Sequence, residues 1–391
     1  MMMAESGMES VTMRFIVFSD DWGVHPSSCQ HLFRRISRRH DVVWINTVGM
    51  RPPTLTWSDA RKITRKLGGM LKRGTESSDS IESARVRVVQ PPMLPFGSSS
   101  LSRQFNAWSA TRAMRRSFDG GSPPIVLTTV PNVCDYVKAL PGAKVVYYCV
   151  DDFSEWPGLD KSLILQMENS LIEKADILVA TSDRLYERLS ESGKPTHMLP
   201  HGVDLDHFSA DEPVEHSCFT NIPAPRAGFF GLFDDRSDQD LIRAVAVAMP
   251  DISFVIAGPV ETTTDRLKGL PNVYFTGSIA YERLPSFIKG LQVLFIPYKI
   301  DTLSESLSPL KLKEYLATGK PVVTTSISAA KQFDDLLNLA DTPGQWADDI
   351  RRLLDCDWEK RRKVVSARFA QESWDHKADL LLEMCQPGAN A

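Results

Sequence analysis

Residues 304–325 read SESLSPLKLKEYLATGKPVVTT, and this stretch is the strongest indication of the fold. Its apolar spacing predicts an amphipathic helix over residues 309–318, which ends at a glycine and leads into a buried strand. Lys311 and Glu314 are three residues apart, so they share one face of this helix. A helix N-terminus beside a cation and a carboxylate suits a ligand with phosphates and a ribose diol, although an ordinary helix with solvated charges has the same pattern.

The composition is that of a soluble globular protein. The 391 residues are 42% hydrophobic and 24% charged, and this length suits two domains that each bury a core. The net charge of −4 argues against a dedicated nucleic-acid-binding protein, so no nucleic-acid partner is expected. Residues 1–200 nevertheless carry a net charge of +4, and the remaining residues carry −8.

The cysteines and the N-terminus indicate a cytoplasmic protein. The six cysteines show neither a CxxC pair nor the spacing of a zinc site, and they are interpreted as reduced thiols. Residues 1–13 lack the pattern of a signal peptide and are expected to be a tail or a misplaced start. Since no stretch approaches the ~18–20 apolar residues of a membrane-spanning helix, contact with the inner face of the plasma membrane is expected to be peripheral only.

Strand and helix patterns alternate along the whole chain, which predicts an α/β fold with parallel sheets. In the first half, strands are expected over residues 14–18, 41–46, 85–89, 125–129, 144–149, 176–181 and 197–200. In the second half, they are expected over residues 227–230, 253–257, 273–276, 293–296 and 322–324.

Three segments resemble the GT-B glycosyltransferases of the group 1, or GT4-like, superfamily. Residues 201–208, HGVDLDHF, resemble the segment that links the two domains of that family. The pattern of residues 271–298 is similar to the middle portion of the family, and residues 304–325 resemble its donor-binding helix. The resemblance covers residues 14–385.

This resemblance implies two Rossmann-like domains that face a cleft. Residues 14–200 would bind the acceptor and residues 201–369 the nucleotide sugar, while residues 370–391 would form a helix that crosses back to the first domain. The implied activity is that of an EC 2.4 hexosyl- or glycosyltransferase. It would move a sugar from a UDP- or GDP-sugar to a glycan or lipid-linked acceptor in polysaccharide or cell-envelope biosynthesis. The nucleotide sugar is a substrate, and neither a cofactor nor a metal is expected.

The resemblance also assigns a donor site. Lys311 would stabilise the diphosphate leaving group and Glu314 would bind the ribose. The other residues expected around the donor are Ser308, Pro309, Leu310, Gly231, Arg236 and Tyr298. The chain departs from the retaining branch of the family, because Leu232 and Ser237 stand where that branch has an arginine and a lysine.

Asp151 is the expected catalytic base. The sequence KVVYYCVDD, residues 144–152, resembles a strand of xanthan-type glucuronosyltransferases that ends in an aspartate. A carboxylate there could remove the acceptor proton, and the anomeric centre would then invert. Asp152 is the substitute candidate, and capping of the next turn is the structural alternative for both residues.

The acceptor side is expected to include Trp22, Gly23, His25 and His31, although a structural role remains open for the histidines. The basic, tryptophan-bearing residues 52–75, and similarly residues 102–118, either lie on an anionic membrane or form a solvated face. Two other functions remain open. They are a nucleotide-sugar 2-epimerase and a degenerate GT-B module that binds a glycan or a partner without catalysis.

Overall fold

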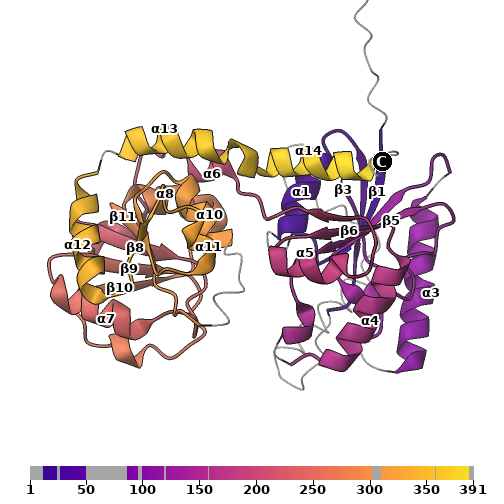
Figure 1. Cartoon of the computed structure of the whole chain (residues 1–391), viewed down its shortest axis with the longest axis horizontal. Coiled ribbons are helices and arrows are strands. Elements are labelled where there is room, and N and C mark those ends of the chain that lie inside the picture. Colours follow the sequence, from indigo (N-terminus) through magenta and orange to yellow (C-terminus); the bar gives the residue numbers. More distant parts are fainter. Residues whose placement is uncertain are drawn as a thin grey trace, which may run out of the picture. The chain divides into compact units, whose positions relative to one another are not determined.

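The computed structural model describes residues 12–23, 27–49, 86–95, 99–118, 120–156, 158–301, 310–356 and 358–386. The chain divides into two compact units (Figure 1). Unit 1 comprises Met1–Pro200 with Lys377–Ala391, and unit 2 comprises His201–His376. Within the described ranges, no helix is long and apolar enough to cross a membrane.

Unit 1 contains a parallel sheet, which confirms the α/β class predicted for this half. The sheet has seven strands in the described residues, in the order β3-β2-β1-β4-β5-β6-β7. Their bounds are β1 (Arg14–Ser19), β2 (Asp41–Asn46), β3 (Val86–Val89), β4 (Ile125–Thr128), β5 (Lys144–Cys149), β6 (Ile177–Ala180) and β7 (Thr196–Met198). The central strands are continuous apolar runs because both faces of the sheet are covered. The strand order reverses between β1 and β4.

Three helices of unit 1, α1, α4 and α5, begin where the sequence supplies a capping side chain. Ser27, Asp160 and Ser182 each accept a hydrogen bond from a backbone N–H in the first turn that follows. The helices are α1 (Ser28–Ile36), α3 (Ser100–Ser117), α4 (Lys161–Lys174) and α5 (Asp183–Ser190), with the short 3-10 helices η1 (Pro131–Val133) and η2 (Phe153–Glu155).

Unit 2 is a second parallel sheet with helices on both faces. Its six described strands follow the order β10-β9-β8-β11-β12-β13, which reverses between β8 and β11. They are β8 (Arg226–Phe230), β9 (Ser253–Ala257), β10 (Val273–Gly277), β11 (Val293–Ile296), β12 (Val322–Thr324) and β13 (Asn338–Leu339). The short β13 was not expected from the sequence.

The helices of unit 2 include the predicted donor helix. It is α10 (Leu310–Ala317), which ends one residue before the predicted end, and the predicted first residue, 309, lies outside the described residues. The others are α6 (Leu205–Phe208), α7 (Gln239–Ala248), α8 (Leu284–Lys289), α11 (Ser328–Lys331), α12 (Pro343–Leu354) and α13 (Trp358–Phe369). The 3-10 helices of this unit are η3 (Ser217–Asn221), η4 (Asp265–Leu267), η5 (Tyr281–Arg283) and η6 (Ala370–Glu372).

The terminal segment differs from the single helix expected over residues 370–391. Phe369 ends α13, and the last helix is α14 (Trp374–Cys385), whose residues from Lys377 onward belong to unit 1. The interruption has a local cause. The N–H of Val203 donates to Glu372 O at 2.8 Å, and the N–H of Trp374 donates to Val203 O at 3.2 Å. These bonds direct the backbone of residues 372–374 toward residue 203 instead of into a helix.

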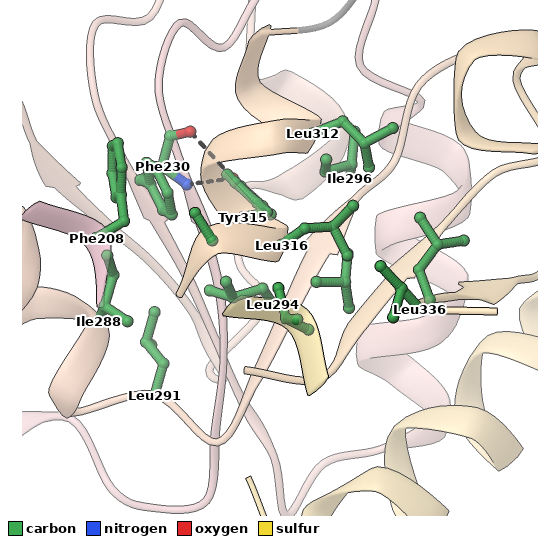
Figure 2. Close-up of a cluster of buried hydrophobic side chains, with 14 of the residues drawn as sticks. Phe208, Phe230, Ile288, Leu291, Leu294, Ile296, Leu312, Tyr315, Leu316 and Leu336 are labelled. Atoms are coloured by element: carbon green, nitrogen blue, oxygen red, sulfur yellow. Dashed lines mark hydrogen bonds between the residues drawn. The ribbon is translucent and has the colours of Figure 1, made fainter. Parts of the chain in front are cut away.

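Tyr315 fixes α10 against the sheet at the point where the strand order reverses (Figure 2). β8 and β11 pair only through Ala227 and Gly228, so the end of β8 is free on that side. There the Tyr315 hydroxyl accepts a hydrogen bond from the N–H of Phe230 at 2.6 Å and donates one to its C=O at 3.0 Å. Leu312 and Leu316 pack beside it in the same buried cluster. α10 is therefore held at the position where open α/β sheets bind ligands.

Candidate functional site

A glycine at the end of β8 makes room for a lysine side chain. Gly231 has a φ of +118°, a backbone conformation that other residues rarely adopt. A Cβ atom at this position would lie 2.5 Å from Cε of Lys311. The N–H of Gly231 donates to Ala257 O at 2.8 Å, which joins the turn to β9. The structure therefore brings together Gly231 and Lys311, which are eighty residues apart in the sequence.

Lys311 lies in a half-buried, partly aromatic environment. Its Nζ is 4.2 Å from the ring centroid of Phe229 and 5.4 Å from that of Tyr298. It donates one hydrogen bond, to Leu232 O at 3.2 Å, and forms no ion pair with the described residues. Burial, together with the nearby charge of Arg236, lowers the pKa of Lys311 to about 7. The ammonium is thus only partly compensated within the protein.

Glu314 is the second group at this edge whose charge is only partly compensated. Desolvation raises the pKa of the Glu314 carboxyl to about 7, against the opposing charge of Lys311. No described residue donates a hydrogen bond to this carboxylate. A ligand with hydroxyl donors would satisfy Glu314, and an anionic ligand would satisfy Lys311.

Arg236 lies nearby, but its guanidinium is already paired. Nε donates to Asp234 at 2.9 Å and Nη2 donates at 2.6 Å, and the group lies 5.7 Å from the Tyr298 ring centroid. Burial alone would raise the pKa of Asp234, but the bonds and charge of Arg236 lower it below its ordinary value. The positive charge of Arg236 is therefore largely neutralised by Asp234 in the same loop.

Tyr298 packs beside Arg236 and Lys311. It is only 3% exposed, and burial raises the pKa of its hydroxyl to about 12. Its backbone C=O accepts a hydrogen bond from the Thr325 hydroxyl at 2.7 Å, and Ser237 bridges to it from the loop after β8. Of the remaining expected donor residues, Leu310 is the first residue of α10, whereas Ser308 and Pro309 lie outside the described residues.

The two candidate bases follow β5 in unit 1 and differ in their partners. Asp151 accepts hydrogen bonds from the N–H of Asp152 at 2.7 Å and from Nε1 of Trp156 at 2.9 Å. Asp152 accepts from the Ser154 hydroxyl at 2.7 Å and faces Arg184 at 3.6 Å. Asp151 thus accepts hydrogen bonds from neutral donors only. Asp152 occupies the N-cap position of η2, but its side chain makes no capping hydrogen bond.

Sequence reasoning missed a buried ionic network beneath this segment. Glu168 of α4 is 3% exposed and accepts hydrogen bonds from the Tyr147 hydroxyl at 2.7 Å and from Arg188 at 2.6 Å. Arg188 also lies 3.7 Å from the Cys149 sulfur, at the end of β5. A signal was available in the sequence, because Glu168 occupies the apolar face of α4 together with Ile164 and Leu171.

The loop after β1 holds the described part of the expected acceptor side. Gly23 donates its N–H to Oε1 of Gln30 at 3.0 Å, and the amide of Gln30 donates in turn to Asp20. Trp22 is half-buried and packs edge-to-face on Trp44, with ring centroids 4.7 Å apart. His31 is 6% exposed on α1, and His25 lies outside the described residues. Gln30, which is fully buried, is a second positioning residue that sequence reasoning missed.

Comparison with known proteins gives this geometry a family context. Residues 224–356, about a third of the chain, match the family model described as "Glycosyl transferases group 1". Sucrose-phosphate synthase from Thermosynechococcus elongatus matches 95% of this chain and 98% of its own, with a TM-score of 0.60 and 17% identity. The Anabaena protein HepE, solved with UDP and glucose, matches the same shares with a TM-score of 0.58 and 14% identity.

The chain has the GT-B fold, and residues 224–356 are similar to group 1 glycosyltransferases. Among relatives, the putative teichuronic acid biosynthesis glycosyltransferase TuaH of Bacillus subtilis is 29% identical over 44% of this chain and 46% of its own length. The D-inositol 3-phosphate glycosyltransferase of Mycolicibacterium smegmatis is 23% identical over 55% of this chain and 54% of its own. The matches thus span about half the length of these relatives.

Several expected donor residues come together within the matched residues 224–356. Gly231, Lys311 and Glu314 line one edge of its sheet, and Arg236 and Tyr298 lie directly beside them. The expected catalytic and acceptor residues belong to the sheet edge of unit 1 instead. The catalytic and binding roles of all these residues stay predictions.

Proposed function

We propose that this GT-B protein transfers a sugar from a nucleotide-sugar donor to a glycan or lipid-linked acceptor in cell-envelope polysaccharide biosynthesis. The observation that carries the proposal is the pair Lys311 and Glu314. Both are half-buried at the sheet edge of unit 2, and neither forms an ion pair among the described residues. The name of the Bacillus subtilis relative, a putative teichuronic acid biosynthesis glycosyltransferase, supports an envelope polysaccharide as the product.

The donor is proposed to bind unit 2 through two complementary contacts. A diphosphate beside Lys311 would offset the desolvation of the ammonium, and ribose hydroxyls would donate to Glu314. Gly231 has no side chain, so the methylene groups of Lys311 can pack directly against its backbone. A UDP-sugar is favoured over a GDP-sugar, because solved structures of similar fold contain UDP or a UDP-sugar.

Asp151 is proposed to remove the proton from the acceptor hydroxyl. The acceptor oxygen would form a bond to the anomeric carbon, while the bond between that carbon and the diphosphate oxygen breaks. The proton would go to Asp151 and the nucleoside diphosphate would leave, with inversion at the anomeric carbon. Asp152 is less suitable, because its carboxylate already faces Arg184 and accepts a hydrogen bond from Ser154.

The proposal is tested by separating nucleotide binding from sugar transfer. UDP should raise the melting temperature of the wild type, and a screen of UDP-sugars with NMR of the product should give the transferred sugar and its configuration. Asp151→Asn should keep the UDP shift and lose transfer by a factor of about 10²–10⁴. Glu187→Gln, a change at an exposed carboxylate on α5, serves as the matched control and should be inert.

A binding module without catalysis is the second candidate. The pairing of Arg236 with Asp234 favours it, because the loop after β8 then contributes little net positive charge to a diphosphate. In that case UDP would still stabilise the wild type, but no nucleotide sugar would be consumed with any glycan acceptor. Transfer of the sugar by the wild type excludes this candidate. A product that keeps the bond between sugar and nucleotide, but in which the sugar has become its 2-epimer, would instead identify a 2-epimerase.

A further inference from the structure

Helix α3 of unit 1, labelled in Figure 1, carries large apolar side chains that are exposed to solvent. Leu101, Phe105 and Trp108 are 75%, 37% and 57% exposed. Their spacing of four and three residues places them on one face of the helix. The buried side consists mainly of small residues, namely Ser109, Ala110 and Ala113, with Met114. A helix that serves only to cover a core has the opposite arrangement.

The same exposed face becomes cationic toward the end of the helix. Arg112, Arg115 and Arg116 are exposed and continue the spacing of the apolar residues. The guanidinium of Arg112 lies over the Trp108 ring, 5.9 Å from its centroid. In the part of the chain that the structure describes, none of the three arginines forms an ion pair with a carboxylate.

A groove of about 540 Å³ lies between α3 and the edge strand β3, and it is basic as well. Among the described residues, its charged lining residues are Arg87, Arg112 and Arg116, and none of the lining residues is acidic. Val88 in the groove and Leu94 near the start of α3 are each 44% exposed, which extends the apolar surface. The groove and the helix together form one surface that is both apolar and positively charged.

We propose that this α3 surface, formed by Leu101, Phe105, Trp108, Arg112, Arg115 and Arg116, docks the protein onto an anionic lipid bilayer. The aromatic and leucine side chains enter the boundary between headgroups and acyl chains, and the guanidinium groups bind lipid phosphates. A soluble anion would need only the arginines, and a self-associating face would not gain from uncompensated like charge. The combination favours a membrane. This inference rests on the proposed function, because the biological role of membrane docking would be to reach a lipid-linked acceptor.

Co-sedimentation of the full chain with vesicles tests the proposal. We expect binding to phosphatidylcholine vesicles that contain phosphatidylglycerol, and none to phosphatidylcholine alone. Arg112→Gln with Arg116→Gln should lower the partition coefficient by about fivefold for each charge removed and should reduce its salt dependence. Phe105→Ser with Trp108→Ser should weaken binding at every salt concentration. The matched controls are Val247→Ser on α7 and Arg351→Gln on α12, both exposed in unit 2, and they should bind as the wild type does.

Vesicles with brominated acyl chains locate the inserted residue. Trp108→Phe should keep vesicle binding but lose much of the quenching of tryptophan fluorescence that the wild type shows. The UDP-induced shift of the melting temperature, measured on each variant, separates a failure of membrane docking from a failure of the proposed glycosyltransferase function.

Three results would overturn the inference. The first is a wild type that does not bind anionic vesicles. The second is a set of α3 variants that bind them as tightly as the wild type, which would place the membrane contact elsewhere. The third is a wild type that self-associates in sedimentation velocity and is made monomeric by the Phe105 and Trp108 changes, which would identify a second copy as the occupant.

Discussion

At the residue scale, the pKa values of Lys311 and Glu314 are both shifted toward neutrality by the same cause. Removal from water lowers the pKa of the lysine to about 7 and raises that of the carboxyl to about 7. Neither group has a strong partner among the described residues, so the site is electrostatically incomplete without a ligand. A nucleoside diphosphate supplies the charge and the hydroxyl donors that would complete it.

The first prediction concerns proton uptake on nucleotide binding. A bound diphosphate raises the pKa of Lys311 above its unliganded value of about 7, so UDP prefers the protonated form and binds more weakly as pH rises above 7. Calorimetry at about pH 8, in two buffers that differ in ionisation enthalpy, should therefore detect proton uptake. Lys311→Met should abolish the uptake and weaken UDP binding by roughly 10–100-fold. Equal proton uptake in the variant would show that another group titrates.

The second prediction concerns Gly231. Gly231→Ala places a Cβ atom in a backbone conformation that favours glycine, and also against Lys311 Cε. It should lower the free energy of unfolding by about 1–2 kcal/mol from backbone strain alone, with an additional loss of UDP binding. Urea denaturation measures the first effect. Gly344→Ala, at an open position in α12, is the control and should be neutral or slightly stabilising.

At the scale of elements, α10 depends on one hydroxyl group for its position against the sheet. Tyr315 takes the place of a strand neighbour where β8 and β11 separate, and it satisfies both polar groups of the Phe230 backbone. The helix that carries Lys311 and Glu314 is thereby tied to β8, the strand that directly precedes Gly231. The geometry of the donor residues should therefore depend on a side chain that does not touch the ligand.

The third prediction follows from this tie. Tyr315→Phe leaves two buried backbone groups without a partner, which should cost about 1–3 kcal/mol of unfolding free energy, and it should weaken UDP binding as well. Tyr148→Phe is a matched control in unit 1, because the buried hydroxyl of Tyr148 has no hydrogen-bond partner among the described residues. Its loss should be neutral or stabilising. The role assigned to Tyr315 would be wrong if the two variants unfolded at the same urea concentration.

At the scale of the whole molecule, the chain consists of two units that each bury their own core. The cluster around Phe18 and Tyr147 belongs to unit 1, and the clusters around Tyr315 and Phe229 belong to unit 2. Chains of this kind need not unfold in a single step. The proposed donor residues all belong to unit 2, whereas the proposed membrane surface belongs to unit 1. Ligand effects should therefore be separable by unit.

The fourth prediction is a unit-specific response to UDP. Scanning calorimetry should show a transition that UDP raises, with stabilisation of about 2.7 kcal/mol at a UDP concentration a hundred times the Kd. This shift should survive addition of EDTA, because the positive charge is proposed to come from Lys311 rather than from a metal. Lys311→Met should reduce the shift. A shift that EDTA removes and magnesium restores would contradict the expected independence from metal.

The sequence by itself determined the elements that depend on local patterns. Apolar runs predicted most strands to within one or two residues, because strand periodicity is local. The position of Lys311 and Glu314 on one helix face followed from their spacing alone. The segments 52–75 and 304–309, on which some of the sequence predictions depend, lie outside the described residues.

Only the tertiary structure decided which distant groups meet. Periodicity shows that Leu101, Phe105 and Trp108 share a face, but not that this face is turned to solvent. The turn at residues 370–373 depends on hydrogen bonds to Val203, and the end of β8 depends on the hydroxyl of Tyr315. The fit of Lys311 over Gly231 likewise depends on the packing of α10 against the sheet. Such contacts follow from how whole elements pack, because the residues that make them are tens to hundreds of positions apart.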